Sequence, residues 1–202
     1  MQAMPSPSAA AREIPATKMG VLLLIVSESV FFLLLILAFV FYRAAPASAG
    51  GPTVFNSLDV PKTAFFSVCL YASSLTIWLA DRSVKRGHDL RLKAWLLATI
   101  VLGGIFLYGQ ASEYYKLTSE QGVTPGRNLF GSTFFTLTGF HGLHVLVGLC
   151  LLLTLFVLAL RGTFKGGRGA SGFETVSWYW HFVDGVWVVI FPIVYLWSLV
   201  GH

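Results

Sequence analysis

The stretch from Phe130 to Leu160 constrains the fold most, because it contains no Lys, Arg, Asp or Glu over 31 residues. A helix of that length extends about 46 Å, which exceeds the about 30 Å of a bilayer core. The stretch therefore predicts a membrane-spanning helix that tilts or protrudes. His141 and His144 lie near its middle, three residues apart, and so share one face of that helix. Because polar side chains in a membrane helix normally face protein, we expect this helix to pack against other spans.

The composition of the whole chain agrees with this interpretation. Its 202 residues are 55% hydrophobic and only 11% charged, whereas soluble domains carry about 25% charged residues. The chain is therefore predicted to be an integral membrane protein without a sizeable soluble domain. We interpret the net charge of +5 as basic residues in short loops that orient the helices, and we expect no nucleic-acid partner.

Five apolar stretches predict an all-α integral membrane protein whose five-helix transmembrane bundle occupies residues 19–202. Residues 1–18 contain three prolines and are predicted to be a mobile N-terminal tail. The tail and the loops after the second and fourth spans hold ten of the 14 Lys and Arg residues, so the N-terminus is predicted inside and the C-terminus outside. The predicted spans are 19–41, 62–80, 94–112, 130–160 and 173–200.

Glu28 is the one charged residue in the first predicted span, in the stretch SESVFF. It follows Lys18 by ten residues, which places it about 15 Å along the helix and close to the bilayer midplane. An ionised, unpaired carboxylate at that depth costs several kcal/mol, so we expect Glu28 to be protonated, paired or hydrated. Two interpretations stay open: a protonated carboxyl that hydrogen-bonds a neighbouring helix, and a proton-exchanging or partner-facing group.

Two further polar sites stand out near or within the predicted spans. His181 and Asp184 are three residues apart in WYWHFVDGVW, so either they hydrogen-bond one another or both face another helix. Glu113 in QASEYY falls at a predicted membrane boundary, next to Tyr114 and Tyr115. Aromatic residues at that depth are typical of an interfacial belt, and a solvated helix end is an equally good interpretation of Glu113.

Two backbone features are also expected in the last two spans. The small residues Thr138 and Gly142, four apart with Gly139 beside them, predict a close approach by another helix. Pro192 is expected to kink the fifth span, because proline removes a backbone donor from the helix.

The ionisable residues within the spans leave three classes of function open. A haem protein would use His144 and His181, with His141 nearby, but a two-haem protein needs four well-placed histidines and the spans offer three. A small transporter would use Glu28 and Asp184 as coupling acids, but five helices without a visible repeat argue against it. A non-catalytic helical subunit of a larger membrane complex is the class that composition favours.

Four stretches closely resemble subunit III of haem-copper terminal oxidases, in its short five-helix bacterial form. They are SESVFFLLLILAFVFYR, QASEYY, GSTFFTLTGFHGLHVLVG and WYWHFVDGVWVVIFPIVYLW, and they occur in the family's order between residues 20 and 199. The resemblance implies a helical bundle beside the catalytic subunit I, with subunit II and other respiratory-complex subunits as further partners. It implies haems and copper in partner subunits only, and no catalytic residue, metal or redox centre in this chain.

The resemblance also implies roles for individual residues. Glu28 stands where the family has its buried, carbodiimide-reactive carboxyl. His141, His144, His181 and Asp184 match the family's polar interior residues, for which we expect a structural role. Subunit III of this family helps to keep proton uptake by subunit I fast and protects the oxidase from inactivation during turnover.

Several expectations depend on the branch of the family. The longer form has seven helices, and this chain is expected to lack the first two, which form one arm of a lipid-holding cleft. It therefore stays open whether this chain binds phospholipids, and whether a neighbouring chain replaces the missing arm. The five-helix form implies a bacterial plasma membrane. QASEYY and GFHGLHVLVG favour the cytochrome c oxidase branch, with a quinol oxidase as the alternative.

Overall fold

The computed structural model describes residues 16–44, 58–120, 122, 129–167 and 169–197. This part of the chain forms five long helices, each long and apolar enough to cross a membrane. The prediction of an all-helical chain with five apolar helices is confirmed, and the orientation in the membrane stays a prediction. The helices are α1 (Ala16–Ala44), α2 (Val60–Lys85), α3 (Asp89–Ser119), α4 (Leu129–Leu160) and α5 (Ala170–Phe191).

The first four helices extend beyond their predicted spans, and the fifth begins three residues before its predicted span, of which residues 198–200 lie outside the described part. Helix α3 runs from Asp89 to Ser119 rather than from 94 to 112, so Glu113 lies inside the helix. The charged residues at the start of α3 are helical because two of them pair one turn apart: Lys93 lies 2.7 Å from Asp89. Helix α1 begins at Ala16, so the last residues of the predicted N-terminal tail are helical, whereas residues 1–15 lie outside the described part.

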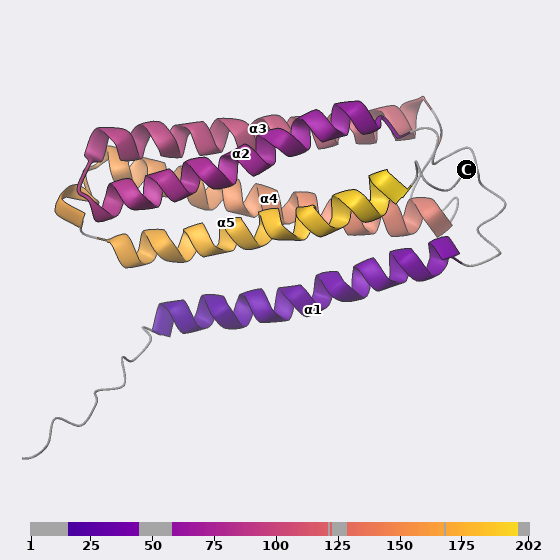
Figure 1. Ribbon diagram of the computed structural model, residues 1–202, viewed down its shortest axis with the longest axis horizontal. Coiled ribbons are helices and arrows are strands. Elements are labelled where there is room, and N and C mark those ends of the chain that lie inside the picture. Colours follow the sequence, from indigo (N-terminus) through magenta and orange to yellow (C-terminus); the bar gives the residue numbers. More distant parts are fainter. Residues whose placement is uncertain (1–15, 45–57, 121, 123–128, 168, 198–202) are drawn as a thin grey trace, which may run out of the picture.

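The five helices lie roughly along one direction, with α2 and α3 side by side and α1 along the opposite edge, against α4 and α5 (Figure 1). Helix α1 buries few side chains, chiefly Phe32 and Phe39, which are 2% and 1% exposed. Its outer face is apolar and open, because Val26 and Phe41 are 61% and 69% exposed. Helix α1 is therefore attached to the bundle by one narrow face.

Several helices approach one another closely around Trp180 of α5, which is 1% exposed. Its ring lies between Gly148 of α4 and Gly103 of α3, where added Cβ atoms would come within 2.7 and 2.8 Å of the ring. Its Nε1–H donates to Ser73 Oγ of α2 at 2.9 Å. One side chain therefore contacts three neighbouring helices. The predicted approach at Gly142 is looser, because a Cβ there would have its nearest neighbour at 4.0 Å.

A second tryptophan repeats this contact two turns further along α5. Trp187 donates its Nε1–H to Ser67 Oγ of α2 at 2.8 Å. Residues seven apart on a helix share a face, so Trp180 and Trp187 both face α2. After Phe191 the backbone continues as a π-helical turn, η4 (Pro192–Leu196), so the α-helical hydrogen bonding ends at Pro192. The kink expected at Pro192 stays a prediction.

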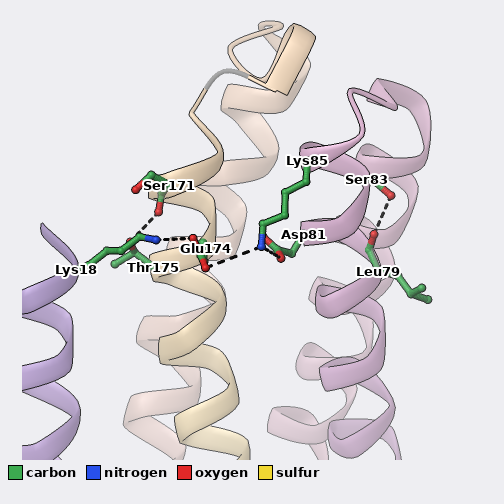
Figure 2. A network of polar contacts seen from close by, with 8 residues as sticks. All are labelled: Lys18, Leu79, Asp81, Ser83, Lys85, Ser171, Glu174 and Thr175. Carbon is green, nitrogen blue, oxygen red and sulfur yellow. Dashed lines mark hydrogen bonds and ion pairs between the residues drawn. The ribbon is translucent and has the colours of Figure 1, made fainter. Parts of the chain in front are cut away.

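An ion-pair network joins three helices at one end of the bundle. Figure 2 shows Lys18 of α1 pointing to Glu174 of α5, at 2.6 Å. Lys85 of α2 lies 3.9 Å from the other oxygen of Glu174 and 2.6 Å from Asp81. The end of α5 that begins at Ala170, after the 3₁₀ turn η3 (Lys165–Gly167), is thus connected to both α1 and α2.

Candidate functional site

Glu28 of α1 and His144 of α4 form a polar pair between the middle parts of these two helices. His144 Nε2 lies 3.2 Å from Glu28 Oε2, and the side chains are 16% and 27% exposed. The other ring nitrogen fixes the orientation of the imidazole, because Nδ1 lies 2.7 Å from the carbonyl oxygen of Phe140, one turn earlier in the same helix. Phe32 packs edge-on against the imidazole, with ring centroids 5.0 Å apart.

The hydrogen bonds of His144 determine how many protons the pair holds. A carbonyl oxygen only accepts, so the Nδ1 of His144 is the N–H donor to Phe140. If the imidazole is neutral, its Nε2 is then an acceptor and Glu28 must be protonated to donate to it. If Glu28 is ionised, Nε2 must carry the proton and the imidazole is cationic. In both cases the contact contains one proton and the pair is neutral overall. A neutral pair has a lower free-energy cost of burial in a membrane than a single charged group.

This pair lines a crevice between α1 and α4. The crevice has a volume of about 230 Å³, and its walls include Leu24, Leu143 and Tyr179. Leu24 and Leu143 are 43% and 50% exposed, so the crevice opens on the outer surface of the bundle. Tyr179 of α5 closes it from the inside and donates its hydroxyl to the backbone oxygen of His144 at 3.2 Å. The shared proton therefore lies within reach of a molecule outside this chain.

His141 lies in a different environment from His144, although the two share a helix face. Its side chain is fully buried and its ring stacks on Trp187, with centroids 4.7 Å apart. Phe106 and Phe32 contact it edge-on. Neither ring nitrogen has a hydrogen-bond partner among the described residues. His141 packs here as an aromatic side chain, and the structural role expected for it stays a prediction.

His181 and Asp184 both contact Ser74 of α2. The Ser74 hydroxyl donates to Asp184 Oδ2, and its oxygen lies 3.2 Å from His181 Nδ1. Because that hydroxyl has only one hydrogen, Nδ1 of His181 must be the donor to Ser74. Of the two arrangements left open by the sequence, the structure shows the one in which both residues face another helix. His144 and His181 thus have separate partners.

Glu113 is buried between helices rather than solvated at a helix end. It is 6% exposed, and its Oε2 accepts hydrogen bonds from Tyr195 at 2.8 Å and from Thr63 at 3.3 Å. Its Oε1 has no partner within the described ranges. The interpretation as a solvated helix end was wrong because α3 continues past this point and η4 returns to cover the carboxyl.

The partners of these groups are mostly serines and tyrosines that the sequence analysis did not single out. On α2 they are Ser67 and Ser73, which accept from Trp187 and Trp180, and Ser74, which contacts His181 and Asp184. Three serines within one apolar span were the available signal for a polar face on α2. Among the described residues, no group of three His, Cys, Asp or Glu side chains is placed to hold a metal ion.

Comparison with known proteins gives a consistent result. A family model described as cytochrome c oxidase subunit III matches residues 11–199. The chain is 39% identical over 184 residues to cytochrome c oxidase subunit 3 of Dasypus novemcinctus, which covers 89% of this chain and 69% of that protein. The Loxodonta africana protein of the same name is 39% identical over 186 residues, with the same coverage.

A relative from a cyanobacterium is equally similar. Cytochrome c oxidase subunit 3 of Synechocystis sp. is 38% identical over 177 residues, which covers 88% of this chain and 74% of that protein. The range matched by the family model thus covers nearly the whole described bundle and includes Glu28, His144 and Tyr179. The chain therefore belongs to the cytochrome c oxidase subunit III family.

Proposed function

We propose that this chain is the non-catalytic subunit III of a proton-pumping haem-copper oxygen reductase in aerobic respiration. The catalytic subunit I, with its haems and copper, is its direct partner, and subunit II belongs to the same complex. Cytochrome c is the proposed electron donor, since the relatives that match are named cytochrome c oxidase subunit 3. The cyanobacterial relative supports a bacterial plasma membrane as the location, and the excess of basic residues supports an N-terminus inside.

We further propose that the chain supports proton uptake by subunit I and the stability of the complex during turnover. The observation that carries this proposal is the Glu28–His144 pair, with its 3.2 Å contact at the edge of an open crevice. The pair has one proton and two acceptor atoms for it, so the proton moves between Glu28 and His144 without a change in net charge. Release of this proton to a neighbouring chain leaves the pair with one negative charge, so the proposed exchange requires that a proton is returned to the pair through the crevice.

The substitution Glu28→Gln separates proton exchange from geometry. A glutamine amide can still donate to a neutral His144 Nε2, but it cannot release or accept a proton. We expect the initial oxygen-consumption rate of the complex to stay largely intact and the time before inactivation to shorten. The measurement is oxygen uptake at saturating reductant, followed until activity is lost.

Ser29→Ala is the matched control on the same helix, because the Ser29 hydroxyl only donates to the backbone oxygen of Ile25, at 2.7 Å. This variant is expected to inactivate at the unaltered rate. If Glu28→Gln and Ser29→Ala inactivate at the same rate, the proposed role of Glu28 is wrong, although membership of the complex would not be affected.

A further inference from the structure

A second hollow lies at the end of the α2–α3 hairpin, on side chains that the Glu28–His144 site does not use. Its volume is about 370 Å³, within the range of about 300–1,000 Å³ typical of ligand pockets. Its walls combine apolar side chains from both helices with four basic ones. The residues used in the argument are Arg82, Arg86, His88, Arg91 and Trp95.

The charges of this hollow are uncompensated within the described part of the chain. The acids of the hairpin pair with lysines instead: Asp81 lies 2.6 Å from Lys85 (Figure 2), and Asp89 lies 2.7 Å from Lys93. Among the described residues, no carboxylate lies within ion-pair distance of any of the three arginines. Three guanidinium groups around one hollow form a site for an anion.

The tryptophans beside the arginines show which kind of anion fits. Trp78 and Trp95 are 43% and 36% exposed, and the Arg82 guanidinium lies 4.4 Å above the centre of the Trp78 ring. Leu75, one turn before Trp78 on the same face of α2, is 59% exposed. The order along the helix is thus charged, aromatic, aliphatic, which is the order of a lipid from its headgroup to its chains.

We propose that this hollow binds the headgroup of an anionic phospholipid of the phosphatidylglycerol type. The phosphate lies against Arg82, Arg86 and Arg91, whose planar donors match phosphate oxygens. The acyl chains follow the exposed face of Trp78 and Leu75. Basic pockets between membrane helices at the predicted cytoplasmic side favour such headgroups. A small inorganic anion would account for the arginines alone, and not for the open aromatic and aliphatic surface beside them.

The test is lipid binding by the whole complex, purified through this chain and depleted of lipid. Native mass spectrometry measures the binding of phosphatidylglycerol, with phosphatidylcholine as the neutral reference. We expect the double variant Arg82→Gln/Arg91→Gln to bind phosphatidylglycerol about 30-fold more weakly, from the typical contribution of each basic residue near a membrane surface. The matched control Arg161→Gln/Lys165→Gln removes two exposed charges from the loop after α4 and is expected to leave binding unchanged.

Several results would overturn the proposal. Equal binding of the two lipids, or unchanged binding by Arg82→Gln/Arg91→Gln, would show that the hollow is not an anionic lipid site. Competition by inorganic phosphate at equal concentration would assign it to a small anion. Loss of a partner subunit from the double variant would assign it to a protein contact.

A measurement without substitutions covers the case in which the double variant does not assemble. Phosphatidylglycerol with a photoreactive group close to the headgroup is expected to crosslink to peptides from residues 79–95 of the unaltered chain. Crosslinks confined to other segments would contradict the assignment.

Discussion

The substitution Gly148→Ala tests whether the contact around Trp180 determines how the helices pack. The added Cβ would lie 2.7 Å from Trp180 Cε3 and 3.4 Å from Tyr179 Cε1. The Trp180 ring cannot move away, because Gly103 lies on its other side and its Nε1–H is bonded to Ser73. Overpacking of this kind costs about 1–3 kcal/mol, and the better helix propensity of alanine offsets about 0.5–1 kcal/mol of it.

Gly142→Ala is the matched control on the same helix, because the nearest atom to its Cβ would be Leu107 Cδ1 at 4.0 Å. The gain in helix propensity is common to both variants, so the difference between them isolates the overpacking cost of about 1–3 kcal/mol. The assay is unfolding of the purified chain in mild detergent by increasing dodecyl sulfate, followed by near-ultraviolet circular dichroism. If Gly148→Ala is as stable as Gly142→Ala, the reasoning about Trp180 is wrong.

Two further substitutions test buried hydrogen bonds in the same unfolding assay. Ser73→Ala leaves the indole Nε1–H of Trp180 without its partner and is expected to cost about 1–3 kcal/mol; Ser112→Ala, whose hydroxyl only bonds the backbone oxygen of Gly109, is the control. Tyr195→Phe removes the donor 2.8 Å from the buried Glu113 carboxyl and is expected to cost a similar amount. Tyr108→Phe, at a side chain 72% exposed, should have little effect; equal losses for the two tyrosine variants would contradict the buried role of Glu113.

The helices were predictable from the sequence because a backbone in a membrane must satisfy its hydrogen bonds internally. Long uncharged stretches therefore fix helical structure directly. The helix ends were less predictable, since Asp89 and Lys93 look like loop residues until their pairing one turn apart is known. Glu113 was misplaced for the same reason: its neighbours resemble an interfacial belt, and nothing local shows that Tyr195 covers it.

The identity of the candidate site residues was predictable, but their pairing was not. An ionisable residue within a span stands out because placing its side chain in a bilayer costs free energy, and Glu28 and His144 were selected on that ground. Their contact joins residues 116 positions apart in the sequence, and helix periodicity says nothing about which spans are neighbours. His141 shows the limit most clearly, because sharing a face with His144 did not give it a similar environment.

The measurement that tests the proposed function most directly is purification of this chain, through a tag and in gentle detergent, with identification of its partners and a reduced-minus-oxidised spectrum. The proposal predicts a large copper-bearing partner and a-type haem in the purified complex. A spectrum of b- and o-type haems would still indicate an oxidase of this superfamily, with quinol rather than cytochrome c as the electron donor. A chain without any haem-containing partner, after crosslinking in the membrane before solubilisation, would contradict the proposed function.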